Sequence, residues 1–331
     1  MCRKASSVSR LPFVDPHPTL PRGTCWAHQT VIVLIMSKYR LAAAPAVLIS
    51  ASLVLAACSG LGTAPATTAV AVPGSTTSAP QPSTTTSVAT TTTVPPSPYA
   101  RPDWLGTRLL PLRPDEFGEV LPTPAELVDR AFETPDVLPP PAGDEFESTV
   151  QPVPADVLER STWTPDCPVT VDELAYVTVS HWGFDQQFHT GEILVNAAVA
   201  DDIVEVFRRL HEIRFPIEEM RVIRLEEIDA HPTGDWNDTT SFVCRPAVGS
   251  GNWSQHAFGT AVDVNPFHNP YLKGDLVLPE LASVYLDRAD QRPGMIADED
   301  EVVQAFADIG WRWGGYWNSL KDWMHFSLSG G

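Results

Sequence analysis

The second half of the 331-residue sequence predicts an α+β domain, with a small antiparallel sheet and helices segregated from it. Short β-rich runs are bounded by glycine and other turn residues, and only two segments carry the helical periodicity of an amphipathic helix. No internal repeat with a period of about 20 to 50 residues is present, which argues against a repeat architecture. These observations place the domain at residues 163–331.

The elements of this domain follow from local patterns. Residues 174–179 and 192–195 are β-rich and separated by turn residues, which predicts two strands. Apolar residues between 199 and 213 recur on one stripe, which predicts a core helix. A second helix is expected over 302–309, with Gly310 as its left-handed stop. Further short strands are predicted at 220–225, 242–245, 261–264, 311–313 and 325–328.

An export signal precedes the domain. Residues 36–57 combine a short basic head, an apolar stretch and small residues before Cys58, which is the pattern of a secretory signal. The Leu-Ala-Ala-Cys end resembles a bacterial lipobox, so Cys58 is predicted to become the lipidated first residue. The alternative is a signal anchor that stays in the membrane, although the apolar run is short for a bilayer span. Residues 1–35 carry no pattern and stay unassigned; a start at Met36 would leave them untranslated.

Two segments connect the signal to the domain. Residues 58–98 are dominated by Thr, Ser, Pro, Ala and Val, which bury too little apolar surface to offset the entropy of ordering. A disordered linker is therefore predicted there. Residues 99–162 are rich in Pro and acidic side chains and contain one short helical pattern, at 124–132. We expect an extended arm that is wrapped on the domain or loosely attached to it.

The charge of the chain limits its partners. It has 22 Lys and Arg against 41 Asp and Glu, a formal net charge of −19. Such a surface repels nucleic acid and anionic lipid, so we expect no nucleic-acid partner and contact with a membrane through the lipid anchor only. The expected location is the outer face of the cytoplasmic membrane, and the expected state is a monomer.

Two motifs near the C-terminus carry the residues of a metal site. In a strand that contains Asp263, side chains alternate between faces, and Gly259 allows a turn that lets His256 face the same point. Asp322 and His325 are three residues apart, which brings them close together on a turn or a helical start. Two imidazoles and one carboxylate leave a fourth zinc position open, as in catalytic zinc sites. The pattern predicts a zinc hydrolase with one carboxylate to spare.

Other hydrolase mechanisms have weaker support. Ser254 has histidine and aspartate residues nearby in the sequence, but no Gly-x-Ser-x-Gly motif is present, so this serine is interpreted as orienting the loop of His256. The His-Glu-x-x-His motif of thermolysin-like proteases is absent as well. Each histidine taken alone is more often a core side chain than a ligand. The joint occurrence of both motifs favours the metal site.

Cys167 and Cys244 are the two cysteines of the predicted domain. Outside the cell, such a pair is expected to form one disulfide. The bridge would tie the start of the domain to the segment that leads into the metal site. Two isolated buried thiols are the alternative.

The two motifs, Ser-x-His-x-x-Gly-x-Ala-x-Asp ending at Asp263 and Asp-x-x-His ending at His325, resemble a known enzyme family. They are similar to those of the VanY-type zinc D-alanyl-D-alanine carboxypeptidases and of their L-alanyl-D-glutamate endopeptidase relatives. The resemblance covers about 163–329 and implies the Hedgehog/DD-peptidase fold. It includes five further motifs in the same order, at 188–192, 215–220, 242–245, 265–270 and 310–315.

The resemblance also implies roles for single residues. It assigns zinc binding to His256, Asp263 and His325, the general base to Asp322, and polarisation of the scissile carbonyl to Arg245. Many relatives carry Glu at the position of Asp322, whereas the endopeptidase-like branch also uses Asp. This departure leaves the exact cleavage open, and we expect a D-alanyl-D-alanine carboxypeptidase with the L-alanyl-D-glutamate endopeptidase as the alternative.

Peptidoglycan stem peptides are the substrates that the resemblance implies, and they place the enzyme facing the cell wall. His189, Ser254 and Trp323 are the candidate substrate-binding residues. Two other functions stay open. One is a catalytically silent wall-binding module with structural zinc, and the other is a serine-type transpeptidase or esterase.

Overall fold

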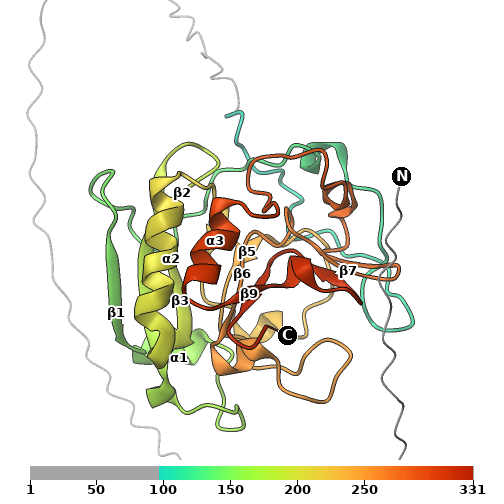
Figure 1. Ribbon diagram of the computed structural model, residues 1–331. Helices are drawn as coiled ribbons and strands as arrows, with labels where there is room; N and C mark the ends of the chain where they lie inside the picture. Colours follow the sequence, from blue (N-terminus) through green and yellow to red (C-terminus); the bar gives the residue numbers. More distant parts are fainter. Residues whose placement is uncertain (1–96, 331) are drawn as a thin grey trace, which may run out of the picture. The chain divides into compact units, whose positions relative to one another are not determined.

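The computed structural model describes residues 97–330 of the chain (Figure 1). This part is a mixed α+β structure with several small antiparallel sheets and few helices, which confirms the predicted fold class. The predictions for residues 1–35, 36–57 and Cys58, and for all but the last two residues of the linker, lie outside the described residues. Among residues 97–330, every helix is too short or too polar to be a candidate for crossing a membrane.

The largest sheet consists of β1 (Ser148–Pro152), β2 (Leu174–Trp182) and β3 (Phe188–Asn196), antiparallel and in that order. Strand β1 is exposed along its whole length, while β2 and β3 are almost entirely buried. Because both of their faces are buried, β2 and β3 lack a strict alternation of apolar and polar residues in the sequence.

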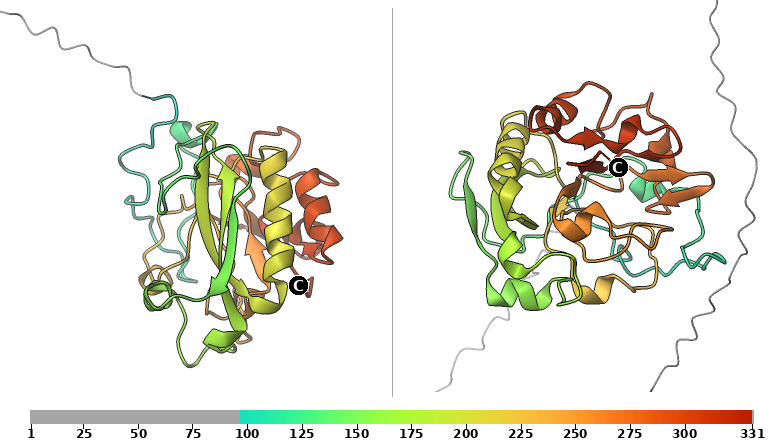
Figure 2. Two further views of the ribbon diagram at one scale, coloured as in Figure 1. Left: turned by 90° about the vertical axis from the view of Figure 1, so that its left-hand side faces the viewer. Right: turned by 60° about the horizontal axis from the view of Figure 1, so that its bottom comes forward.

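Two helices cover this core (Figures 1 and 2). Helix α2 (Ala200–Glu212) packs its apolar stripe on β2 and also contacts α3 (Glu301–Asp308), which in turn packs on β9. The Asp300 side chain caps α3, and Gly310 follows that helix with a φ of 82°, as its predicted stop requires. Both predicted core helices are present within two residues of their expected bounds at either end.

Three smaller sheets complete the fold. Two of them are antiparallel, with the strand orders β6-β11-β9 and β10-β7-β8, and the third is the parallel pair β4-β5. The strands are β4 (Glu219–Met220), β5 (Asp238–Thr239), β6 (Ala261–Asp263), β7 (Tyr271–Lys273), β8 (Leu276–Leu278), β9 (Arg312–Trp313), β10 (Lys321–Asp322) and β11 (His325–Ser327). The other helices are α1 (Ala155–Arg160) and the 3-10 turns η1 (Ala125–Leu127), η2 (Val171–Glu173), η3 (Ala197–Val199), η4 (Leu225–Glu227), η5 (Gln255–Phe258), η6 (Ser283–Leu286) and η7 (Gly314–Tyr316).

The arm is packed into the fold instead of lying loosely on it. Leu127 and Phe132 share a buried cluster with Phe267 and Tyr285 of the domain. The Arg130 guanidinium donates two hydrogen bonds of 2.7 Å to the carboxylate of Glu218, and both side chains are buried. A buried charge is stable only when it is paired, so this ion pair fixes the arm against the domain.

Two predicted strands are largely absent. Over 220–225 only Met220 is in a strand, and the segment continues into η4. Residues 242–245 form no strand, because their backbone amides do not bond to one neighbouring strand. Those of residues 242, 243 and 245 donate to the carbonyls of Leu194, His256 and Val243, respectively. The β-rich composition reflects the burial of this segment between other elements, which sequence alone does not distinguish from strand pairing.

Candidate metal centre

The register of one strand pair brings Asp263 and His325 together. Strands β6 and β11 are antiparallel, and Asp263 lies directly opposite His325. Side chains of directly opposed residues lie on the same face of a sheet. The Nδ1 atom of His325 is 3.0 Å from Oδ1 of Asp263. Residues 62 positions apart in sequence thus become neighbours.

The third side chain comes from the turn before β6. Ser254 caps η5, and its hydroxyl accepts a hydrogen bond of 3.3 Å from the amide of His256. Gly259 ends the turn with a φ of 66°, and a side chain there would meet the amide nitrogen of Asn196 at 2.5 Å. The chain therefore reverses at Gly259, which directs His256 and Asp263 toward the same point, as the sequence predicted.

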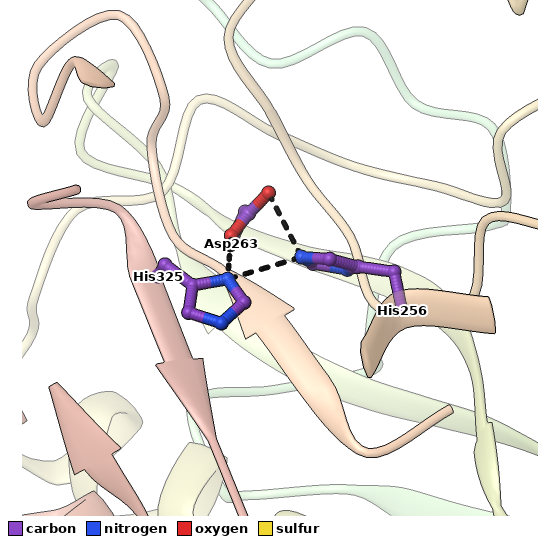
Figure 3. A group of neighbouring side chains, drawn as sticks. All are labelled: His256, Asp263 and His325. Atoms are coloured by element: carbon purple, nitrogen blue, oxygen red, sulfur yellow. Dashed lines mark hydrogen bonds and ion pairs between the residues drawn. The ribbon is translucent and has the colours of Figure 1, made fainter. Parts of the chain in front are cut away.

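The three side chains meet in one cluster (Figure 3). The Nε2 atom of His256 is 3.2 Å from Nδ1 of His325 and 3.2 Å from Oδ2 of Asp263. On its other side, His256 donates Nδ1–H to the backbone carbonyl of Ser241 over 2.6 Å. Because a carbonyl can only accept, this contact fixes the tautomer and leaves the lone pair of Nε2 pointing into the cluster.

This donor set fits one metal ion. The candidate ligand atoms of His256, Asp263 and His325 all lie within 4.8 Å of one another. No other three histidine, cysteine or acidic side chains among the described residues bring their ligand atoms this close together. Burial by itself would raise the pKa of Asp263, but the two imidazoles lower it well below its usual range. The carboxylate is therefore ionised, as a ligand must be.

Asp322 lies beside this cluster without belonging to it. Its Oδ1 atom is buried and has no hydrogen-bond partner within the described part of the chain. Burial raises its pKa to about 7, and the charge of Asp263 acts in the same direction, while those of His325 and Arg245 act against it. A buried carboxyl oxygen without a partner and a raised pKa are properties that a general base would have.

Arg245 reaches the same region from a neighbouring loop. Its guanidinium is partly exposed and donates to the carbonyl of Pro246, and its charge acts on Asp322. The residue before it, Cys244, forms a disulfide with Cys167, 77 positions earlier. The predicted disulfide is therefore present and anchors the backbone next to Arg245.

Two aromatic residues near the cluster are not among the predicted site residues. Tyr271 lies directly opposite Asp322 in the β7–β10 pair, so both side chains share one face, and burial together with the Asp322 charge raises its pKa. The ring of Trp317 is 5.3 Å from that of His325. Tyr271 follows the Asn-Pro motif at 269–270, which was the one signal that pointed to it.

The other candidate substrate residues lie elsewhere. His189 is held between Asp136, 2.8 Å from Nδ1, and Asp185, 3.0 Å from Nε2. It lines a cavity of about 470 Å³ between the arm and the β2–β3 hairpin, and none of the three candidate ligands lines that cavity. Trp323 lines a different cavity, which also lacks the ligands. Of the three, only Ser254 contacts a ligand residue, through the amide of His256.

Comparison with known proteins agrees with the motifs. Residues 248–328 match the model of a family described as D-alanyl-D-alanine carboxypeptidase. No curated protein and no solved structure matches the chain. The matched range includes His256, Asp263, Asp322 and His325, whereas Arg245 lies just outside it. This match agrees with the predicted family: residues 248–328 resemble the D-alanyl-D-alanine carboxypeptidases, and together with the site geometry they support a peptidase role.

Proposed function

We propose that this protein is a zinc peptidase that hydrolyses the stem peptides of peptidoglycan, with D-alanyl-D-alanine carboxypeptidase activity favoured over L-alanyl-D-glutamate endopeptidase activity. One observation carries the proposal. Two imidazole nitrogens and a carboxylate approach one another within 3.0 to 3.2 Å, beside a buried carboxyl oxygen of Asp322 that has no partner. A structural zinc site, which is closed by four protein ligands, does not require an additional carboxyl group that binds no metal.

The metal and the residues of the chain divide the chemistry. Zinc held by His256, Asp263 and His325 would lower the pKa of a water molecule and polarise the scissile carbonyl. Asp322 accepts a proton from the attacking water and delivers it to the leaving amine, a role that a pKa near the working pH favours. Arg245 supplies positive charge where the oxyanion develops.

The same proposal includes the fold family and the location. The strand arrangement around the site supports the Hedgehog/DD-peptidase fold that the motifs imply. The export signal at 36–57 and the lipobox-like Cys58 support a lipid-anchored protein on the outer face of the cytoplasmic membrane, facing the cell wall. A monomer that binds stem peptides, without a nucleic-acid partner, is consistent with the acidic composition.

Mass spectrometry of digested muropeptides tests the activity. The full chain, loaded with zinc, is incubated with muropeptides that carry pentapeptide stems. Loss of the terminal D-alanine identifies the carboxypeptidase, and separation of L-alanine from D-glutamate identifies the endopeptidase. A chelator is expected to abolish either product, and added zinc to restore it.

Two variants separate the roles. Asp322→Asn is expected to keep its zinc and lose turnover by roughly 100-fold or more, the usual scale of a general base. Arg245→Gln is expected to lower kcat while metal content stays unchanged. Zinc binding with no product from any muropeptide would contradict the proposal and favour the silent wall-binding module. Product formation that survives the chelator would favour the serine-type enzyme.

A further inference from the structure

A second cavity lies apart from the metal centre and has no role in the proposed reaction. It has a volume of about 530 Å³, within the range of small-molecule sites. Its walls come from two segments, residues 288–298 and 313–323. The aromatic residues of the wall are Trp313, Tyr316 and Trp323, and its charged residues are Arg288, Asp298 and Lys321.

The cavity lies beside the catalytic segment but does not include the site residues. Lys321 and Trp323 line it, whereas Asp263, Asp322 and His325 do not. Within strand β10 the side chains of Lys321 and Asp322 point to opposite faces, because neighbouring residues of a strand alternate. The cavity and the metal centre therefore share the segment 321–325 but no lining residue.

The chemistry of the wall argues against a simple anion site. Arg288 forms no ion pair with any carboxylate of residues 97–330, but its NH1 and NH2 groups already donate to three backbone carbonyls and to Asn269. Its guanidinium also lies over the Trp323 ring, at 5.1 Å. Asp298 adds a negative charge to the same wall. An incoming anion would find few free donors and one repulsive carboxylate.

A sugar fits this wall better. Pyranose rings present apolar C–H faces that pack on aromatic rings and hydroxyl groups that need donors and acceptors at the rim. The ring of Tyr316 is 51% exposed, and its hydroxyl donates to Asp298 over 2.6 Å, which fixes the ring in place. Lys321 donates to the carbonyl of Gly315 over 2.9 Å, and an ammonium carries three donors. An aromatic platform held in advance binds at a lower entropic cost.

We propose that this cavity binds the glycan strand of the substrate, an N-acetylated amino-sugar chain, on the side of the catalytic segment lined by Lys321 and Trp323. Tyr316 is the stacking platform, Asp298 fixes its orientation, and Lys321 donates to a sugar hydroxyl or acetamide oxygen. The choice of glycan rests on the proposed function, since the stem peptide is covalently attached to that strand. The binding itself involves no hydrolysis.

Binding of chitotetraose, an N-acetylglucosamine tetramer, tests the site without any peptide bond. Intrinsic tryptophan fluorescence of the full chain is titrated with this sugar and, in parallel, with peptide-free glycan strands. Both are expected to bind, and Tyr316→Ala is expected to weaken binding roughly tenfold or more, the scale of losing an aromatic anchor. Tyr316→Phe keeps the ring and is expected to retain most of the affinity.

The controls separate this proposal from the peptidase activity. Trp236→Ala removes an equally exposed aromatic ring outside the cavity and is expected to leave sugar binding unchanged. Asp322→Asn is expected to bind sugar like the unaltered protein even if no muropeptide is ever cleaved. Equal affinities for Tyr316→Ala and Trp236→Ala would overturn the proposal, as would absence of sugar binding. Inorganic phosphate that binds in place of the sugars, and is lost in Lys321→Met, would instead identify an anion site.

Discussion

His325 faces Asp263 across the β6–β11 pair, with 3.0 Å between the imidazole Nδ1 and the carboxylate Oδ1. This contact joins the two motifs that the sequence analysis assigned to one metal site. His256 completes the cluster from the turn before β6, with its tautomer fixed by the carbonyl of Ser241.

Asp263→Asn is expected to lower zinc affinity by roughly 100-fold or more, because even changes to groups behind the ligands cost about 10- to 100-fold. The amide is the same size but carries no charge. Competition with a chromogenic chelator measures the affinity. Asp275→Asn, an exposed position at which the side chain is 87% accessible, is the control and is expected to leave zinc affinity unchanged. Equal affinities for the two variants would exclude Asp263 as a ligand.

Asp322→Asn is expected to stabilise the metal-free protein at pH 8 but not at pH 4. Burial raises the folded-state pKa of Asp322 to about 7, whereas an unfolded Asp titrates near 3.9. The folded state therefore binds the proton more tightly and loses stability as the pH rises from about 4 to 7. Asn cannot ionise and avoids this loss.

Thermal unfolding in the presence of chelator measures the effect, with a gain in Tm of about 2–4 °C for each kcal/mol in a domain of this size. The Asp275→Asn variant again serves as the control. An equal gain at pH 4 and pH 8 would mean that the substitution acts through packing and not through the charge of Asp322.

The double variant Cys167→Ser/Cys244→Ser is expected to lose about 2–5 kcal/mol of unfolding free energy, since the bridge spans 77 positions and restricts the unfolded chain. Denaturant unfolding measures the loss. Reduction of the unaltered protein is expected to lower stability by the same amount, with no effect on the double variant. Because Cys244 precedes Arg245, we also expect lower kcat in the double variant with an unchanged zinc content.

Arg130→Met is expected to cost about 3–5 kcal/mol, because it removes the closest cation from the buried carboxylate of Glu218 and leaves it with Asn237 and the more distant Arg101. Burial alone would raise the pKa of Glu218, and the Arg130 charge offsets this and lowers it. The pair therefore stabilises the fold above about pH 4.5, the ordinary Glu value, and this contribution is lost as the pH falls further.

Denaturant unfolding between pH 3 and pH 8 tests this pair. The deficit of Arg130→Met is expected to shrink toward acid pH, where Glu218 is protonated, and to be partly recovered at neutral pH by Arg130→Met/Glu218→Gln. A deficit independent of pH would show that lost packing of the arm, not the unpaired charge, causes the instability.

The sequence predicted those elements whose local pattern matches the face that the folded protein buries. Helix α2 carries its apolar stripe in the sequence, and α3 has both a capping Asp300 and the stop at Gly310. The strand predicted over 242–245 is absent because Phe242 is buried against β2 and β3 without forming a strand pair. Strands β7, β8 and β10 were missed because two or three residues carry no periodicity.

The sequence by itself determined which side chains hold the site, because a strand and a glycine turn place His256 and Asp263 on one face by local geometry alone. The spacing of residues in two motifs also predicted the family that residues 248–328 resemble. Only the tertiary structure decided that His325 opposes Asp263, that Asp322 faces Tyr271, and that His189 and Trp323 line separate cavities. These relations depend on strand register and on which face each strand buries, and both are set by long-range packing that no local pattern encodes.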